Sequence, residues 1–278
     1  MAAIPLIGKT PATSRREVGV AVPSRGVTRR SLGAMNRVLR AHSGLVELAM
    51  AVGLYAVYEL VRGFGSTTLA TARAHTDAIV ALERSLGVYG ERGVQNAVDA
   101  LPGVPALLGF LYMSLHLGAT AALLIWVYRS RRADFALVRT TIMIATAISL
   151  VIYVLYPAAP PRLAGLGFAD TVTEKSGINL SSESLGSLYN PFAAVPSLHF
   201  GYALLVGGAL YALARRRWVR WIGAAYPPAM LFIIVATGNH FLFDAAAGGV
   251  VVIASWFAAR ALLRPRAARA RLEPALAC

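Results

Sequence analysis

Six long apolar runs, separated by polar or basic stretches, constrain this chain more than any other feature of its sequence. A helix that spans a bilayer needs about 20 predominantly apolar residues. The runs have about this length and cover residues 44–61, 104–128, 138–156, 196–214, 221–237 and 241–263. With 57% hydrophobic and 14% charged residues, the chain is also too apolar for an ordinary soluble domain. We therefore predict an all-α, polytopic membrane bundle with six transmembrane helices.

The same pattern divides the chain into three parts. Residues 1–43 are rich in arginine, proline, glycine and serine, which predicts a disordered basic tail lying against an anionic membrane surface. Residues 44–263 form the predicted transmembrane domain, and residues 264–278 form a second basic tail. The abundance of alanine, valine and arginine is typical of a bacterial protein from a GC-rich genome.

The stretch 66–99, between the first two runs, is mixed in polarity and supports two interpretations. The residues that recur at roughly helical spacing are Leu69, Ala72, Ile79, Val80, Glu83 and Leu86. Their spacing favours an amphipathic helix at the membrane interface. A solvated loop fits the same residues equally well. Both interpretations stay open at this point.

Lysine and arginine are distributed unequally among the tails and loops. Of the 27 such residues, 21 fall in the N-terminal tail, in the C-terminal segment from Arg260, and in or next to the loops after the second and fourth runs, with Arg139 counted in the first of these loops. The other six lie in the remaining loops, where a similar number of acidic residues roughly balances their charge. Because cytoplasmic loops carry the excess of positive charge, we expect a plasma-membrane protein with both termini in the cytoplasm. This placement accounts for the net charge of +14 without a nucleic-acid partner.

In this topology, three polar segments come together at the outer face of the membrane. They are the end of the third run and the starts of the fourth and sixth, namely residues 156–163, 194–199 and 237–244. They carry Arg162, Ser197, His199, His240 and Asp244. Because ionisable groups at membrane depth are costly and usually functional, we expect a single site built from all three segments.

The residue types in these segments suit phosphoryl transfer. His240 and Asp244 are four residues apart and share a helix face, so the carboxylate can accept a proton from one ring nitrogen and leave the other free to attack. His199, from another helix, can protonate a leaving oxygen. The planar Arg162 guanidinium suits an anionic phosphate, and Ser197 with the amides opening its helix can add donors.

These residues resemble motifs of the type 2 phosphatidic acid phosphatase (PAP2) superfamily. The stretch Pro196-Ser197-Leu198-His199 is similar to the family's Pro-Ser-x-His motif, and His240 with Asp244 matches its His-x-x-x-Asp motif. The resemblance implies a six-helix core, with His240 as nucleophile, Asp244 as its orienting partner and His199 as general acid. The nearest branch looks like the one that contains Aur1-type inositolphosphotransferases and many actinobacterial membrane phosphatases.

The chain departs from the family's phosphatase pattern in the residues that would hold the phosphate. Ile234 stands where that branch has an arginine, and the lysine of the first motif is not recognisable ahead of Arg162. Arg84 or Arg92, from the outer loop, are candidates to replace these cations. Asn239 either caps the sixth helix or contacts the substrate, and His116 is either a substrate contact or a polar partner of the site.

Taken together, the sequence predicts an integral-membrane enzyme that acts on a lipid phosphate at the outer face through a phosphohistidine. Water as acceptor would make it a phosphatase, and an alcohol such as inositol would make it a phosphotransferase. We expect it to need neither a metal nor another cofactor. The alternative is a lipid-binding or transport protein that uses the same cationic pocket without turnover.

Overall fold

The computed structural model describes residues 67–177 and 190–264, together with isolated positions between 45 and 59. The contacts within the chain divide it into two units, Met1–Ala51 and Val52–Cys278. Leu45, Ala49 and Met50 of the first unit are helical. The fold below is that of the second unit. Both predicted tails and most of the first predicted span lie outside the described residues.

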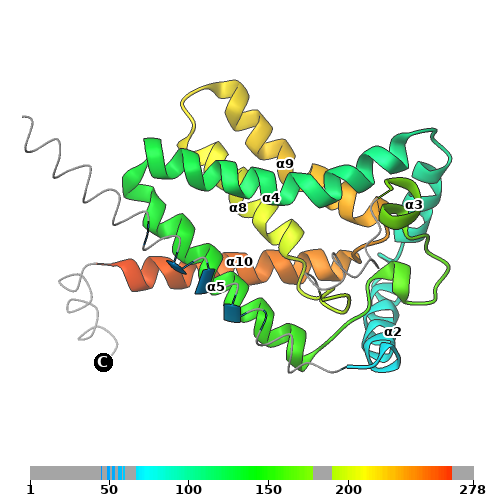
Figure 1. The fold of residues 1–278 in the computed structure, drawn as a ribbon. Coiled ribbons are helices and arrows are strands. Elements are labelled where there is room, and N and C mark those ends of the chain that lie inside the picture. The colour runs from blue at the N-terminus through cyan, green and yellow to red at the C-terminus, as the bar shows by residue number, and fades with distance from the viewer. Residues whose placement is uncertain are drawn as a thin grey trace, which may run out of the picture. The chain divides into compact units, whose positions relative to one another are not determined.

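The described part of the second unit is helical and contains no strand (Figure 1). It has eight named α-helices and one short 3-10 helix. The α-helices are α2 (Leu69–Ser85), α3 (Glu91–Asp99), α4 (Val104–Ser130), α5 (Arg132–Leu155), α6 (Thr171–Lys175), α8 (Leu198–Leu213), α9 (Arg217–Ala236) and α10 (Leu242–Leu263), and the 3-10 helix η1 is Pro161–Leu163.

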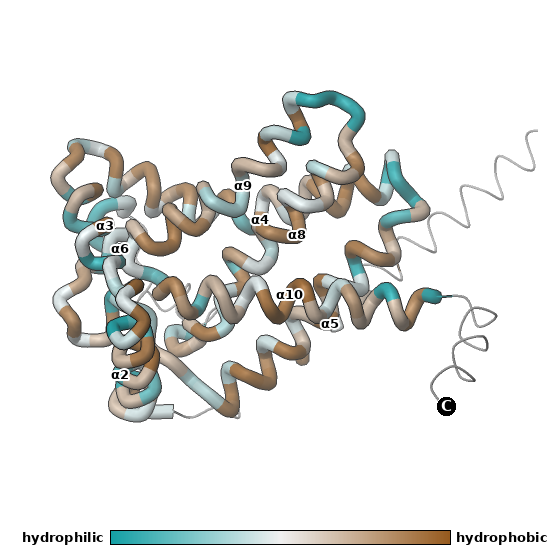
Figure 2. The backbone as a smooth tube through the Cα atoms, turned by 180° about the vertical axis from the view of Figure 1, so that it is seen from behind, coloured by the Kyte–Doolittle hydropathy of each residue, from teal (hydrophilic) through white to brown (hydrophobic). Residues whose placement is uncertain are grey.

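Four of these helices, α4, α5, α9 and α10, are long and apolar enough to cross a membrane. The fifth apolar helix, α8, has only 16 residues, or about 24 Å at the rise of an α-helix, against about 30 Å of bilayer hydrocarbon. Figure 2 shows apolar residues along all five. The prediction of an all-helical membrane-type bundle is confirmed, whereas a count of exactly six spans is not established by the described residues.

The mixed stretch after the first predicted span forms two helices, α2 and α3, which decides between the two interpretations in favour of helix. Ile79 and Val80 of α2 are buried against Phe168 and Phe241. Leu86 does not extend the amphipathic face as its spacing suggested, because it is the C-cap of α2 and is 66% exposed. Gly87 follows with a positive φ of 70°, a conformation that glycine adopts without steric cost.

Glycines allow α8 to pack closely against both of its neighbours. A Cβ atom on Gly207 of α8 would lie 2.5 Å from the carbonyl oxygen of Gly223 in α9. A Cβ atom on Gly248 of α10 would lie 2.1 Å from the carbonyl oxygen of Ser197, directly before α8. Small residues commonly permit such backbone contacts in membrane bundles. Here the contacts set the start of α8 directly on the first turns of α10.

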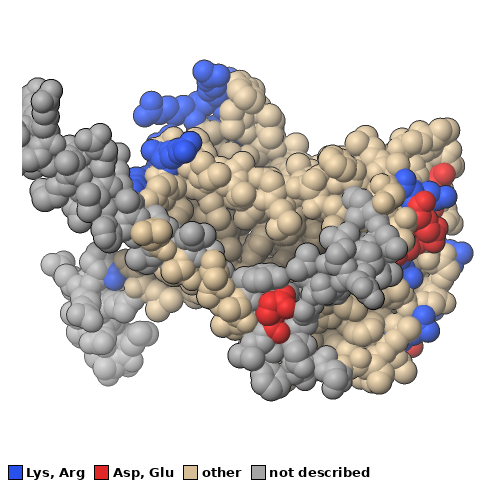
Figure 3. Space-filling model, in the orientation of Figure 1, with Lys and Arg blue, Asp and Glu red and all other residues tan. Residues whose placement is uncertain are grey.

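The two ends of the bundle differ in what they carry. At one end, the starts of α8 and α10 and the end of α9 lie together with α3 and the segment 157–177 (Figure 1). At the other end are the turns that join α4 to α5 and α8 to α9, where arginines gather (Figure 3). These include Arg129, Arg131, Arg132, Arg215, Arg216 and Arg217.

Candidate active site

His240, directly before the N-cap of α10, and Asp244, in the first turn of α10, lie together in the interior. His240 is 4% exposed and Asp244 is fully buried. Nδ1 of His240 lies 3.1 Å from the Ala194 carbonyl oxygen and 3.3 Å from Oδ2 of Asp244. Both neighbours are acceptors, so Nδ1 must carry the hydrogen and donate it. Nε2 of His240 therefore keeps its lone pair, which is the form required of a nucleophile.

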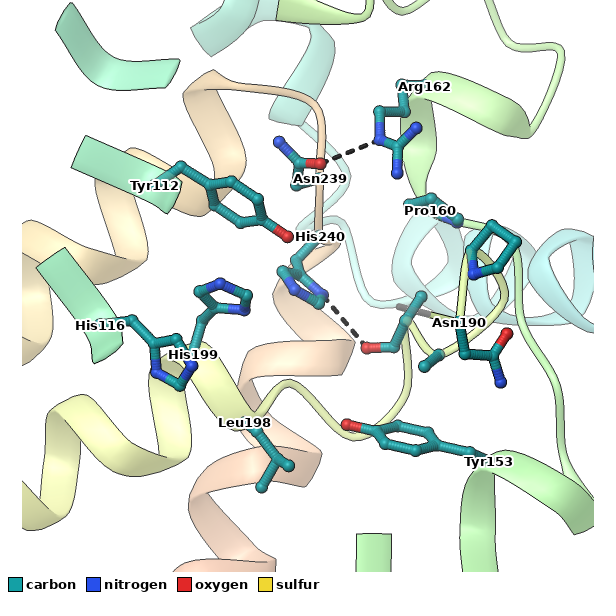
Figure 4. Close-up of a pocket in the computed structure, with 13 residues that line it drawn as sticks. Tyr112, His116, Tyr153, Pro160, Arg162, Asn190, Leu198, His199, Asn239 and His240 are labelled. Atoms are coloured by element: carbon teal, nitrogen blue, oxygen red, sulfur yellow. Dashed lines mark hydrogen bonds between the residues drawn. The ribbon is translucent and has the colours of Figure 1, made fainter. Parts of the chain in front are cut away.

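The first turn of α8 places His199 opposite His240. The two ring centroids are 5.6 Å apart and the rings are tilted by 52°. The His199 ring is stacked on the Tyr112 ring of α4, with the two centroids 4.3 Å apart. The centroid of the His116 ring also lies 4.3 Å from that of His199 (Figure 4). These aromatic contacts fix the orientation of the His199 ring. A phosphate between the two imidazoles would have a nitrogen on each side.

Ser197 has a structural contact that explains its position. Its hydroxyl is the N-cap of α8 and accepts from the Phe200 amide at 3.4 Å, and its own amide donates to the Asp244 carbonyl oxygen at 2.9 Å. The side chain is fully buried and is not part of the cavity wall described below. Its place in the sequence motif thus reflects how α8 begins, rather than a contact made by its hydroxyl in the cavity.

Arg162 is held in place at three points. Its backbone amide donates to the Gly238 carbonyl oxygen at 2.9 Å, and its Nε donates to Oδ1 of Asn239 at 2.9 Å. Its guanidinium also forms an ion pair with Asp170 at 3.3 Å. Asn239 does not cap α10, because the helix begins later, with Phe241 at the N-cap position. The Asn239 side chain instead joins Thr237 to Arg162.

A cavity of about 220 Å³ connects these groups. Figure 4 shows His199 and His240 facing one another across it, with Arg162 and Asn239 at one side. Of the residues singled out from the sequence, His199, His240, Arg162, Asn239 and His116 line the cavity, and Asp244 lies behind His240. The rest of the wall is Tyr112, Tyr153, Pro160, Asn190, Pro191, Ala193, Ala194 and Leu198.

Arg84 and Arg92, the two replacement cations considered from the sequence, do not line this cavity. The Arg84 guanidinium lies over the Tyr89 ring at 4.9 Å. Arg92 donates from its guanidinium to the Leu166 carbonyl oxygen. Arg162 is thus the cation of the cavity wall within the described residues.

A family model described as the PAP2 superfamily matches residues 77–258. That is well over half of the chain, and it includes every residue of the site. The chain belongs to the PAP2 superfamily. Searches among curated proteins and among solved structures gave no match.

PAP2 membership indicates an enzyme of the phosphatase type that acts on a phosphate-containing substrate. The superfamily resemblance drawn from the His199 and His240 motifs is confirmed at this level, while its finer branch is not. The matched range begins within α2 and ends within α10, so the two amphipathic helices belong to the family unit together with the apolar ones.

Two buried carboxylates near the site are not predicted from the sequence to belong to it. Glu83 of α2 is 2% exposed and Glu91 of α3 is 1% exposed. Glu91 accepts from the Leu242 amide at 3.0 Å and Glu83 from the Phe243 amide at 2.6 Å, both at the start of α10. Burial raises the pKa of Glu83 from 4.5 to about 8, and nearby Glu91 and Asp244 add to the rise against the opposing Phe243 hydrogen bond.

Proposed function

We propose that this PAP2 protein is an integral-membrane enzyme that transfers the phosphoryl group of a lipid phosphate through a phosphohistidine on His240. One observation carries the proposal. Nδ1 of His240 is enclosed by two acceptors, Ala194 O and Asp244 Oδ2, while the ring borders a cavity that contains His199 on the opposite wall. A nucleophile with a fixed tautomer and a facing acid are the two groups that this chemistry requires.

In the first step, Nε2 of His240 attacks phosphorus, and the bond between phosphorus and the lipid oxygen breaks. His199 gives its proton to that oxygen, so the lipid leaves as an alcohol. In the second step, His199 takes a proton from the acceptor, whose oxygen attacks phosphorus and releases His240. With water the product is inorganic phosphate, and with an alcohol such as inositol it is a phosphodiester if the donor phosphate keeps a second substituent.

The negative charge that develops on the phosphoryl oxygens needs donors, and the site offers two kinds. Arg162 supplies a guanidinium whose position is set by Asn239 and Asp170. The amides of Leu198 and His199 precede the first intrahelical hydrogen bond of α8, which Gly201 makes to Ser197, and helix N-termini bind phosphate through such amides. His116, whose buried Nδ1 has no partner among the described residues, is a further contact for substrate.

The distribution of charge supports an active site at the outer face of the plasma membrane. The arginines of the α4–α5 and α8–α9 turns lie at the end of the bundle opposite the cavity (Figure 3). Positive charge marks the cytoplasmic side, so the cavity would open at the level of the outer headgroups. The phosphate group of a lipid such as phosphatidic acid or a polyprenyl phosphate lies at this depth.

The test is turnover by purified protein in detergent without added metal. Dioctanoyl phosphatidic acid and farnesyl diphosphate are offered as donors, with and without inositol. Release of inorganic phosphate identifies a phosphatase, and formation of inositol phosphate identifies a transferase. Equal rates for wild type and His240→Ala on every donor would contradict the proposal, and binding of donor without any turnover would favour the lipid-binding or transport alternative.

A further inference from the structure

The N-terminus of α10 is surrounded by three carboxylates. The amide of Phe241 donates to Asp244 at 2.9 Å, that of Leu242 to Glu91 at 3.0 Å and that of Phe243 to Glu83 at 2.6 Å. Carboxylates are favoured at a helix N-terminus, where unpaired amides and the helix dipole meet. One carboxylate would be enough for a cap, so the other two need a separate explanation.

Glu83 and Glu91 come from helices outside the apolar bundle. Glu83 lies in the last turn of α2, and Glu91 is the first residue of α3. The second oxygen of Glu91 accepts from the Gly90 amide at 2.9 Å. Each glutamate therefore fastens an amphipathic helix to the turn of α10 that follows His240. Within the described residues, these two hydrogen bonds are polar links between that turn and helices α2 and α3.

We propose that Glu83 and Glu91 are positioning residues, which hold the first turn of α10 so that His240 and Asp244 stay aligned, and which occupy amides that would otherwise attract the phosphate. Their effect reaches the substrate only through His240, which Asp244 of that turn contacts at 3.3 Å. The inference rests on the proposed function, because it assigns these carboxylates a part in that reaction. It also explains why the phosphate would bind at the start of α8, whose amides are not taken by carboxylates.

Protonation gives this arrangement a recognisable pH dependence. The charged groups facing Glu83 are Glu91 from α3 and Asp244 from α10, and Asp244 in turn contacts His240. With its pKa raised to about 8, Glu83 is a neutral acid at pH 7 and becomes an anion as the pH rises through about 8. Because the folded protein holds this proton more tightly than the unfolded chain, the contribution to stability is present below pH 4.5 and is lost as the pH rises to about 8.

Substitutions of Glu83 separate anchoring from charge. Glu83→Ala removes the acceptor for the Phe243 amide, and kcat is expected to fall by one to two orders of magnitude because a small displacement of the nucleophile is enough for such a loss. Glu83→Gln keeps an acceptor oxygen and stays neutral, so it is expected to retain kcat at pH 7. Wild-type kcat is expected to decline as the pH rises through about 8, because ionised Glu83 adds a negative charge beside the turn that follows His240. Glu83→Gln is expected to lack this part of the decline. Asp77→Ala is the matched control, since Asp77 is an exposed acid of the same helix.

A second measurement does not depend on turnover. Hydrogen exchange of a peptide that covers residues 238–246 is compared among wild type, Glu83→Ala, Glu91→Ala and the controls Asp77→Ala and Asp99→Ala. Asp99 is an exposed acid of α3. We expect faster exchange at the start of α10 in the two glutamate variants, with wild-type exchange in both controls and a melting temperature that shows each variant is folded.

The two measurements distinguish failure of the inference from failure of the function. Unchanged exchange and unchanged kcat in both glutamate variants, in protein that turns over a lipid phosphate, would overturn the positioning role and leave the function standing. An alkaline decline that is identical in wild type and Glu83→Gln would also contradict it. If wild type turns over no donor, the proposed function is wrong, and the exchange data alone then support or contradict the anchoring.

Discussion

Helices α8 and α10 both begin at the cavity, yet their N-termini are equipped in opposite ways. The first amides of α10 are bonded to Asp244, Glu91 and Glu83. In α8 the cap is a neutral serine, which takes the Phe200 amide and leaves those of Leu198 and His199 for a ligand. Because both ends carry the same partial positive charge, the difference lies in the residues that surround them.

This difference assigns separate tasks to the two helices. We infer that an anion is favoured at α8, whose first amides are not bonded to acidic side chains, and is disfavoured at α10, where Asp244, Glu91 and Glu83 already accept from the amides. The proposed nucleophile His240 directly precedes the N-cap of α10, and the proposed acid His199 belongs to the first turn of α8. In the proposed mechanism, the phosphate binds at the start of α8 and stays beside Nε2 of His240. It does not bind to the amides of α10, because acidic side chains already accept from them.

The largest expected effect is on the α10 side of this comparison. His240→Ala removes the attacking nitrogen, and turnover is expected to fall by about 10⁴-fold or more, as for other enzymes that lose a nucleophile. The measurement is steady-state release of phosphate from dioctanoyl phosphatidic acid. A folded His240→Ala protein that retains a tenth of wild-type turnover would break the assignment of the nucleophile to α10.

The α8 side is tested by the leaving group. His199→Ala is expected to lower turnover of an alkyl phosphate by about 10²–10⁴-fold, the usual contribution of a general acid. An aryl phosphate with a good leaving group needs no proton from the enzyme in the first step. The loss should therefore be smaller when formation of the phosphoenzyme is followed with 4-nitrophenyl phosphate. Equal losses with both donors would contradict the acid role of His199.

The contact between the two helices can be altered without touching either histidine. In Gly248→Ala the new Cβ would meet the Ser197 carbonyl oxygen at 2.1 Å, so the start of α8 must shift away from α10. A displacement of about 1 Å costs on the order of 10² in rate. Gly208→Ala is the control, because nothing lies within 4 Å of its Cβ position. Similar kcat values for both variants would show that the close contact is not needed for catalysis.

The smallest expected effect concerns Arg162, the cation in the wall of the cavity that lies between the starts of the two helices. Asn239→Ala removes the acceptor of the Arg162 Nε hydrogen and leaves the guanidinium with Asp170. We expect KM for a lipid phosphate to rise on the order of 10-fold, the loss of about one hydrogen bond to a charged group, with a smaller change in kcat. Thr173→Ala serves as a control nearby. A wild-type KM in Asn239→Ala would contradict the idea that Asn239 positions Arg162 for phosphate binding.

Much of the site follows from local patterns in the sequence. The spacing of His240 and Asp244 predicts a shared helix face, and the structure does bring the two side chains to 3.3 Å. His240 nevertheless precedes α10 and does not lie on its helical face. The prediction that His199 lies at the same depth fits its place opposite His240. Asn239 shows the limit of local reasoning, because it looks like a cap although Asp244 takes that task for Phe241. An acid three residues after Phe241 is the signal that identifies the true start of α10.

Glu83 and Glu91 could not be predicted because their partners are backbone amides. The hydrogen bonds join residues 151 and 160 positions apart in the chain, and a backbone amide has no residue type that a motif can record. The glycines are an intermediate case. The small size of Gly248 predicts close packing, but it does not predict that the neighbouring residue is Ser197. In both cases the tertiary arrangement, rather than the residue type, determines the contact.

The most direct test of the account is to trap the phosphorylated enzyme. Protein is mixed with dioctanoyl phosphatidic acid labelled with ³²P, quenched in alkali within milliseconds, digested and analysed by mass spectrometry. The account predicts an acid-labile phosphoryl group on His240 that is absent from His240→Ala. A phosphoryl group on another residue, or phosphate release at the wild-type rate without any labelled intermediate on His240, would contradict it.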